Sequence, residues 1–433
     1  MNDSSVSPAR SVAFDLLRAV LAKHTPLDEA LGAHHGLTKM LERERGFART
    51  LVASTLRQLG RIDKMIDHRL QKPLPDYAEV VRDILRLGVC ELLVLEIPAH
   101  ATVDNAVNQT RLRGHDGFAG VVNAILRRID REDRDRFAEL SPLDALPDWM
   151  AQSWKWTYGD ATAEAMAAAC QVEPNVDISV KSNPEAWATK LEAKLLPTGT
   201  LRRPLSGRVE KLAGFNDGEW WVQDMAAALP AKLLGDVKGR KVLDICAAPG
   251  GKTVQLASAG AEVIAIDRSK NRLKRLEENL ERLHLSVATV VADASKWQPP
   301  AKVGAILLDA PCSATGTIRR HPDIPWLKSE QDVEKLADLQ DRLLDNAASM
   351  LAPGGTLVYC TCSLEAAEGQ ERLETFLTGR GDLERVPVKP EEVGGLSQLI
   401  TEKGELRTRP DHLPEFGGLD GFYACRLRKR GLS

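Results

Sequence analysis

Long apolar runs are absent from this sequence. No stretch of 18 or more apolar residues occurs, and the opening segment, Met1–Ser5, lacks an apolar stretch as well. A transmembrane helix needs about 20 consecutive apolar residues, and an export signal needs an apolar segment near the amino terminus. We therefore expect a cytoplasmic protein that is neither exported nor embedded in a membrane.

Cysteine is scarce. The chain has seven cysteines, none of them in a CxxC pair. Such sparse thiols fit a reducing compartment better than a disulfide framework. One close pair, Cys360 and Cys362, together with distant single cysteines matches no ligand spacing of a structural zinc site. We therefore expect no bound metal.

An excess of charge of one sign is also missing. The formal net charge is −3, so any contact with nucleic acid must come from a local basic patch rather than from the field of the whole protein. At 433 residues, with 43% hydrophobic and 27% charged residues, the chain is long enough for two or three domains with cores of their own.

Two common phosphate-binding motifs do not occur. The dinucleotide motif GxGxxG is absent. Gly251, Lys252 and Thr253 match the end of a P-loop, but Cys246 stands where the first glycine of that motif would have to be. A cradle for a nucleotide polyphosphate is therefore not expected.

Short apolar runs flanked by Gly or Pro dominate the second half of the chain. Such runs are typical of buried strands in a parallel sheet. We predict five strands at 241–245, 262–266, 288–292, 304–308 and 355–359. Because an amphipathic pattern follows the first of them, the sequence predicts an α/β fold in this half.

The turn after the first predicted strand is built from small residues. Paired glycines there allow backbone N–H groups to approach a ligand closely at a helix amino terminus. Asp267 and Asp293 end the second and third strands, where an acid can accept the hydroxyls of a ribose. A nucleoside without a pyrophosphate loop indicates S-adenosylmethionine. The candidate cofactor-binding residues are Cys246, Ala247, Ala248, Pro249, Gly250, Gly251, Lys252, Asp267, Asp293 and Asp309.

Reactive side chains follow the last two predicted strands. Asp309 and Cys312 come after the run at 304–308, and Cys362 comes after the run at 355–359. Active sites of open α/β sheets form outside the carboxyl ends of the strands, so both thiols should face one crevice. The alternative, in which both are small buried hydrophobic residues, is less favoured. Spacing alone leaves open which thiol would attack a substrate.

Three segments carry a family resemblance: VLDICAAPGGKT at 242–253, LLDAPCSATGTIRRHPDIPW at 307–326 and LVYCTCSL at 357–364. They resemble the motifs of the Sun (Fmu) family of RNA cytosine-5 methyltransferases, and the resemblance extends over nearly the whole chain. Three positions depart from the family pattern. Ala314 stands in place of a Gly, Cys360 in place of a Ser or Ala, and Lys181 in place of an Arg.

The resemblance implies three domains. The first, at 1–140, is an all-α NusB-like RNA-binding domain, and the helical periodicity of Phe14, Leu17 and Leu21 agrees with it. The second, at 141–235, is a small α+β RNA-binding or linker domain. The third, at 236–433, is a Rossmann-like, S-adenosylmethionine-dependent methyltransferase.

The resemblance also implies an activity and roles. The expected reaction transfers a methyl group to carbon-5 of a cytosine in small-subunit (16S) ribosomal RNA through a covalent cysteine–cytosine intermediate. Cys362 would be the nucleophile and Cys312 would help to release the product. Covalent addition makes carbon-5 nucleophilic, and a carboxyl group such as Asp309 should offset the negative charge that develops on the ring. Lys252 either caps its helix or orients Asp309.

Contacts with RNA would need basic side chains near the helical motifs and the catalytic loop. We expect Arg127 and Arg128 in the first half and Arg319 and Arg320 beside the catalytic loop to contact phosphates. Trp326 either stacks on a base or belongs to a core.

Two other functions remain open from the sequence alone. One is a non-catalytic RNA-binding assembly or antitermination factor, which would need neither thiols nor a nucleoside loop. The other is a tRNA or DNA cytosine-5 methyltransferase. For the favoured function we expect a monomer with ribosomal RNA as its partner.

Overall fold

The computed structural model describes residues 6–204 and 207–431, and the chain forms two compact units. A helical unit contains the chain up to Val172 together with the segment Ile318–Ser329. A sheet unit contains the chain from Glu173 to Thr317 and from Glu330 onward. The carboxyl-terminal half thus contributes one short segment to the helical unit.

The helical unit contains an apolar core formed by its helices before residue 140, including the predicted amphipathic ones. Phe14, Leu17, Leu51, Leu85 and Leu126 are among its buried members. Its helices are α1 (Pro8–Leu21), α2 (Leu27–Ala33), α3 (His35–Thr38), α4 (Glu42–Arg57), α5 (Leu59–Arg69), α6 (Glu79–Leu93), α7 (Ala99–Leu112), α8 (Ala119–Glu132), α9 (Arg134–Glu139), α10 (Asp148–Tyr158), α11 (Asp160–Cys170) and α16 (Ile324–Leu327).

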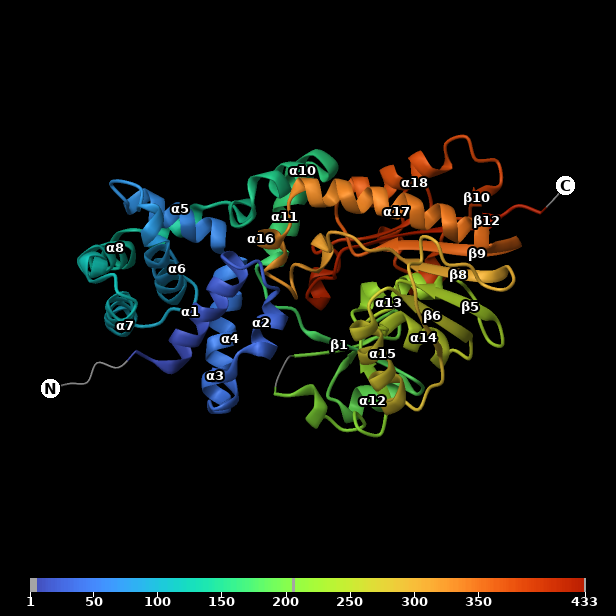
Figure 1. Cartoon of the computed structure of the whole chain (residues 1–433), viewed down its shortest axis with the longest axis horizontal. Coiled ribbons are helices and arrows are strands. Elements are labelled where there is room, and N and C mark those ends of the chain that lie inside the picture. Colours follow the sequence, from blue (N-terminus) through green and yellow to red (C-terminus); the bar gives the residue numbers. More distant parts are fainter. Residues whose placement is uncertain (1–5, 205–206, 432–433) are drawn as a thin grey trace. The chain divides into compact units, whose positions relative to one another are not determined.

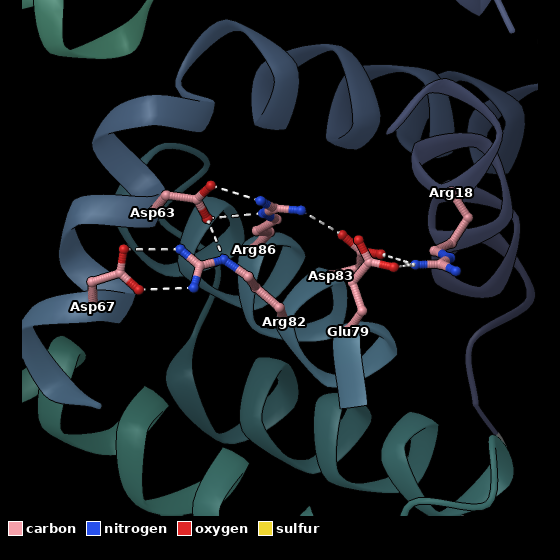
Figure 2. A network of polar contacts seen from close by, with 7 residues as sticks. All are labelled: Arg18, Asp63, Asp67, Glu79, Arg82, Asp83 and Arg86. Atoms are coloured by element: carbon pink, nitrogen blue, oxygen red, sulfur yellow. Dashed lines mark hydrogen bonds and ion pairs between the residues drawn. The ribbon is translucent and has the colours of Figure 1, made fainter. Parts of the chain in front are cut away.

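A network of ion pairs connects three of these helices (Figure 2). Asp83 of α6 accepts hydrogen bonds from Arg86 of the same helix, at 2.8 Å, and from Arg18 of α1, at 3.0 Å. Arg86 also bonds Asp63 of α5 at 2.7 Å. Each charge therefore has an opposite partner, and the arginines of this network serve the fold rather than a ligand.

Residues 141–172 pack differently from the predicted division of the chain. They were expected to open the small α+β domain, but α10 and α11 belong to the helical unit. Trp154 of α10 is fully buried, whereas Trp156 is exposed. Ser141-Pro142, where the predicted α+β domain would begin, is therefore a local break between helices of one unit.

A small antiparallel sheet opens the sheet unit, with the strand order β2-β3-β1-β4. It contains the predicted strand at Ile178. A buried ion pair joins Asp177 to Arg202 at 2.6 Å, and the backbone N–H of Met225 donates to the same carboxylate. The elements are β1 (Val176–Val180), α12 (Pro184–Lys190), β2 (Lys194–Leu195), β3 (Leu201–Arg203) and β4 (Trp220–Val222).

The large sheet has eight strands in the order β10-β12-β9-β8-β5-β6-β7, with β11 paired to β12. All five predicted strands are present in it and are parallel to one another, whereas β12 pairs antiparallel with β9. The elements are β5 (Lys241–Ile245), β6 (Glu262–Asp267), β7 (Ala288–Val291), β8 (Val303–Asp309), β9 (Leu351–Thr361), β10 (Leu383–Arg385), β11 (Leu406–Thr408) and β12 (Phe422–Lys429).

Helices cover both faces of this sheet (Figure 1). On one side lie α13 (Met225–Lys232), α14 (Gly251–Ser258) and α15 (Lys270–Arg282), and on the other α17 (Glu330–Met350) and α18 (Gln370–Leu377). Alternate residues of β8 enter two different cores: Leu307 packs with the first group and Leu308 with the second. The strand order reverses between β5 and β8, which is where open α/β sheets bind their ligands.

Candidate active site

A cavity of about 520 Å³ opens at the carboxyl ends of β5, β6 and β7. Its wall contains three of the residues predicted to bind a nucleoside, Cys246, Asp267 and Asp293. Basic and apolar side chains complete the wall, among them Arg268, Arg272, Leu339 and Leu343. The structure therefore brings the strand-end acids together beside the loop of small residues.

The loop after β5 turns sharply before α14 begins at Gly251. Gly250 has a φ of +108°, and an added Cβ there would lie 2.1 Å from Cδ1 of Leu276. Only glycine fits this close approach without moving the neighbouring helix. The paired glycines thus serve helix packing as well as access of the loop to the cavity.

Asp267 holds this loop in place. It is buried, and its carboxylate accepts hydrogen bonds from the backbone N–H groups of Ser269, at 2.8 Å, and of Ala248, at 3.2 Å. Asp293 is exposed and accepts from Ser295, and this hydrogen bond lowers the pKa of Asp293. Both carboxyl groups have further oxygen lone pairs to offer to hydroxyl groups.

The two predicted thiols lie in contact. Sγ of Cys312, just beyond β8, is 3.4 Å from Sγ of Cys362, just beyond β9. Backbone hydrogen bonds continue between the two loops past the strand ends, since Gly316 N–H donates to the carbonyl of Cys362 at 2.9 Å. The topological expectation of one shared crevice is met by this geometry.

Asp309 at the end of β8 is held from both sides. Lys252 Nζ is 2.8 Å from its Oδ2, and Sγ of Cys360 is 3.4 Å from its Oδ1. Of the two roles considered for Lys252, its contact is therefore with Asp309. Burial opposes the charge on Lys252, but Asp309 outweighs that cost and raises the pKa of the lysine.

A second carboxyl group lies behind this pair. Asp244 of β5 is fully buried and accepts a hydrogen bond from the Thr253 hydroxyl at 2.5 Å. Burial raises the pKa of Asp244 to about 7, despite the Thr253 hydrogen bond. The crevice thus combines a lysine, a strand-end aspartate and a carboxyl group that can hold a proton near neutral pH.

Two thiols of the site, Cys312 and Cys360, have raised pKa values. The hydrogen bond with Cys362 and burial together raise the pKa of Cys312 well above its ordinary value. Burial likewise raises the pKa of Cys360, and Asp309 adds to it. Cys312 and Cys360 are therefore protonated thiols at neutral pH.

The predicted RNA-contacting arginines have different surroundings. Arg127 and Arg128 of α8 are exposed. Arg320 is half-buried, but Arg319 is only 2% exposed. A guanidinium buried to this extent offers no surface to a phosphate, so the expectation for Arg319 has to be corrected.

Trp326 belongs to the core of the helical unit. Its Nε1 donates to the carbonyl of Leu56 at 3.0 Å, and its ring packs against the buried residues of that unit. Of the two roles considered for Trp326, the structure therefore gives the core role.

Sequence reasoning missed Glu368, which lies behind the two thiol loops. Its carboxylate accepts hydrogen bonds from Ser313, the residue after Cys312. The short stretch between β9 and α18 contains two glutamates, Glu365 and Glu368, and follows no periodicity, so only the position of Glu368 six residues after Cys362 could have drawn attention to it.

Two further findings concern groups that other functions would require. Among residues 6–204 and 207–431, no cluster of three or more His, Cys, Asp or Glu side chains has a geometry that could hold a metal ion. Within the same ranges, no helix combines the length and apolar character needed to cross a membrane.

The chain matches the sequence profiles of two protein families. The sequence profile described as "16S rRNA methyltransferase RsmB/F" matches residues 231–428, and that of the "NusB family" matches residues 7–131. Protein PH0851, a solved structure, superposes with a TM-score of 0.76 over 98% of this chain and 99% of its own, at 24% identity. The predicted pairing of a NusB-like helical domain with a Rossmann-like methyltransferase fold is confirmed.

Relatives of full length define the family. Ribosomal RNA small subunit methyltransferase B of Pseudomonas putida is 36% identical, over 97% of this chain and 98% of its own. The protein of the same name from Pasteurella multocida is 34% identical, over 86% of this chain and 85% of its own. The chain belongs to the family of ribosomal RNA small subunit methyltransferase B.

Proposed function

We propose that this protein transfers a methyl group from S-adenosylmethionine to carbon-5 of a cytosine in small-subunit ribosomal RNA, in the cytosol, through a covalent bond to Cys362. The observation that carries the proposal is the pair of thiols 3.4 Å apart, beside the Lys252–Asp309 ion pair. A protein that only binds RNA needs neither group.

The cavity beside β5, β6 and β7 suits the cofactor. Asp267 and Asp293 offer carboxylate oxygens to ribose hydroxyls, and the wall combines these acids with the apolar side chains of Leu339 and Leu343. When bound, S-adenosylmethionine supplies an activated methyl group. The residues of the 246–252 loop, Asp267, Asp293 and Asp309 would hold it.

Covalent addition is needed because carbon-5 of cytosine is a poor nucleophile. The Cys362 thiolate forms a bond to carbon-6, and the ring electrons then make carbon-5 able to attack the methyl group. Negative charge develops at ring nitrogen 3, and a proton passed from the Lys252 ammonium to Asp309, 2.8 Å away, would let the Asp309 carboxyl group donate a hydrogen bond there and offset the charge. The transfer releases S-adenosylhomocysteine. A base such as water then takes the proton from carbon-5, and the electrons of that C–H bond expel the Cys362 sulfur from carbon-6.

Cys312 would serve this last stage. Because its pKa is raised, Cys312 carries a proton at neutral pH and can exchange it with Cys362 across their 3.4 Å contact. Expulsion of the Cys362 sulfur is easier when a proton donor is beside it. The two cysteines would therefore divide the work into attack and release.

Trapping of the covalent adduct tests this division. Cys362→Ala should abolish methylation of 16S RNA by labelled S-adenosylmethionine and give no adduct. Cys312→Ala should attach to RNA and stall, giving a complex that survives denaturing electrophoresis. Cys425→Ala, which changes a buried thiol of β12, is the control and should behave as wild type.

Three outcomes would contradict the proposal. An adduct in Cys362→Ala with none in Cys312→Ala would reverse the roles, and folded but adduct-free variants would remove the covalent mechanism. Methylation of DNA or tRNA in place of 16S RNA would overturn the substrate.

We further propose that Arg127, Arg128 and Arg320 contact RNA phosphates. Replacing Arg127 and Arg128 with Ala should reduce the salt dependence of RNA binding, by about one unit of slope for each lost contact. Lys274→Ala on exposed α15 is the control. An unchanged slope in the double variant would remove these arginines from the interface.

A further inference from the structure

One buried glutamate has hydrogen-bond partners next to both thiols, through its carboxylate on one side and its backbone carbonyl on the other. Glu368 lies at the end of the turn Ala366–Glu368 between β9 and α18 and is 0% exposed. Its Oε1 and Oε2 accept from the N–H of Ser313 at 2.9 and 3.1 Å, and Oε2 accepts from the Ser313 hydroxyl at 2.5 Å. Gln340 Nε2 donates to Oε1 at 3.2 Å.

The same residue also fixes the other loop. Its backbone carbonyl accepts from the hydroxyls of Tyr359, at 2.9 Å, and Thr361, at 3.1 Å. Ser313 Oγ is in turn 3.1 Å from Ser363 Oγ. Ser313 follows Cys312 directly, and Thr361 and Ser363 flank Cys362, so both thiols lie one residue from a contact of this network.

The chemistry of these partners separates this carboxylate from an ordinary stabilising one. The described groups that hydrogen-bond the Glu368 carboxylate are neutral: those of Ser313, Ser363 and Gln340. Burial of a carboxylate without a cation costs stability that an apolar residue would not cost. A group kept at such a cost is better explained by what it orients than by what it stabilises.

We propose that Glu368 is a positioning residue that holds the Cys312 loop against the Cys362 loop, so that Cys312 meets Cys362 during product release. This inference rests on the proposed covalent mechanism. The charge of Glu368 acts in the same direction as the geometry, because a nearby carboxylate disfavours the Cys312 thiolate and keeps that thiol protonated.

Glu368→Gln tests the role with little change in shape. The amide nitrogen of the new glutamine is a donor and cannot accept a hydrogen bond from Ser313, so the Cys312 loop loses a hydrogen bond to residue 368. With 16S RNA and labelled S-adenosylmethionine, kcat should fall about tenfold or more with little change in the Michaelis constant for RNA. An RNA adduct through Cys362 should persist, as in Cys312→Ala. Binding of S-adenosylhomocysteine should be unchanged, because Glu368 does not line the cofactor cavity.

Glu405→Gln is the matched control. Glu405 is a buried glutamate of the same unit, but its partner is Arg385, at 3.0 Å. This variant should show a stability loss without a lasting adduct. If Glu368→Gln lowers only the midpoint of thermal unfolding, with normal kcat per folded molecule and no adduct, the positioning role is wrong.

A second readout does not depend on methyl transfer. Alkylation of Cys312 by iodoacetamide, followed by peptide mass spectrometry, should be about fivefold faster or more in Glu368→Gln, because the loop opens and the thiolate becomes easier to form. Ser313→Ala, which removes one hydrogen bond, should give a smaller increase and serves if Glu368→Gln does not fold. Unchanged alkylation in both variants would overturn the proposal. If Cys312→Ala forms no adduct but alkylation of Cys312 responds to Glu368→Gln, the covalent mechanism fails and the positioning of Cys312 remains.

Discussion

Asp267 connects the nucleoside loop to the cofactor cavity through single hydrogen bonds. Asp267→Ala should weaken binding of S-adenosylmethionine by about 1–3 kcal/mol, because it removes the acceptor for ribose hydroxyls and the partner of Ala248 N–H. Isothermal titration calorimetry measures the change. Glu262→Ala alters an exposed carboxylate at the opposite end of β6 and should leave the affinity as it is. Equal affinities for Asp267→Ala and wild type, both folded, would move the nucleoside elsewhere.

The thiol pair should also respond to oxidation. A disulfide has an S–S length of about 2.05 Å, and the two sulfur atoms are 3.4 Å apart, so a small movement of the loops joins them. Diamide takes up the two hydrogens of Cys312 and Cys362 as the S–S bond forms. We expect loss of methyl transfer that dithiothreitol restores.

The raised pKa of Cys312 gives this reaction a pH dependence. Thiolates are the reactive form, and for such a thiol their fraction rises with pH above neutrality, so inactivation by diamide should accelerate as the pH rises. Peptide mass spectrometry of the inactivated protein should find Cys312 joined to Cys362. Inactivation of wild type with no such peptide would contradict the prediction.

At the scale of elements, the ion-pair network of Figure 2 ties α1 and α5 to α6. Asp83 is 1% exposed and lies between Arg18 and Arg86. Asp83→Asn should lower the free energy of unfolding by roughly 2–3 kcal/mol, because it leaves two partly buried guanidinium groups short of charge. Urea denaturation measures the loss.

Asp67 offers the comparison within the same network. It pairs with Arg82 at 2.8 Å, but its side chain is 59% exposed. Asp67→Asn should therefore cost less than about 1 kcal/mol. Similar losses for Asp83→Asn and Asp67→Asn would mean that burial does not govern the strength of this network.

Several strands and the contact between the two thiols could be predicted from the sequence. Buried parallel strands are continuous apolar runs, so β5 and β8 could be located from their residues alone. The meeting of Cys312 and Cys362 followed from topology, because strand ends share one edge. The prediction that Arg319 contacts a phosphate was wrong, because proximity in sequence to the Cys312 loop does not tell which side of the chain faces solvent. Glu368 could not be identified from the sequence, because its hydrogen-bond partners come from three separate segments.

For the whole molecule, the sequence predicts the correct folds, but the predicted boundary at residues 140–141 differs from the boundary between the two compact units. Local breaks such as Ser141-Pro142 mark the ends of helices, whereas membership of a compact unit depends on which core a helix enters. Residues 141–172 follow the break and still join the helical unit. The segment 318–329 was assigned to the methyltransferase domain by its position in the chain, and it too belongs to the helical unit.

Because the segment 318–329 belongs to the helical unit, the protein cannot be divided into stable fragments by a single cut. Asp323 Oδ2 accepts the Leu27 N–H at 2.8 Å, and the carbonyl of Arg319 accepts from Arg57 at 2.9 Å. A fragment ending at residue 172 would lack these partners, and a fragment starting at residue 173 would carry Trp326 without the helices that cover it. We expect both fragments to be less stable than the intact protein and prone to aggregate. The segment 318–329 begins six residues after Cys312. A fragment boundary at residue 172 would therefore also disturb the loop that contains Cys312, although this loop lies more than a hundred residues further along the chain.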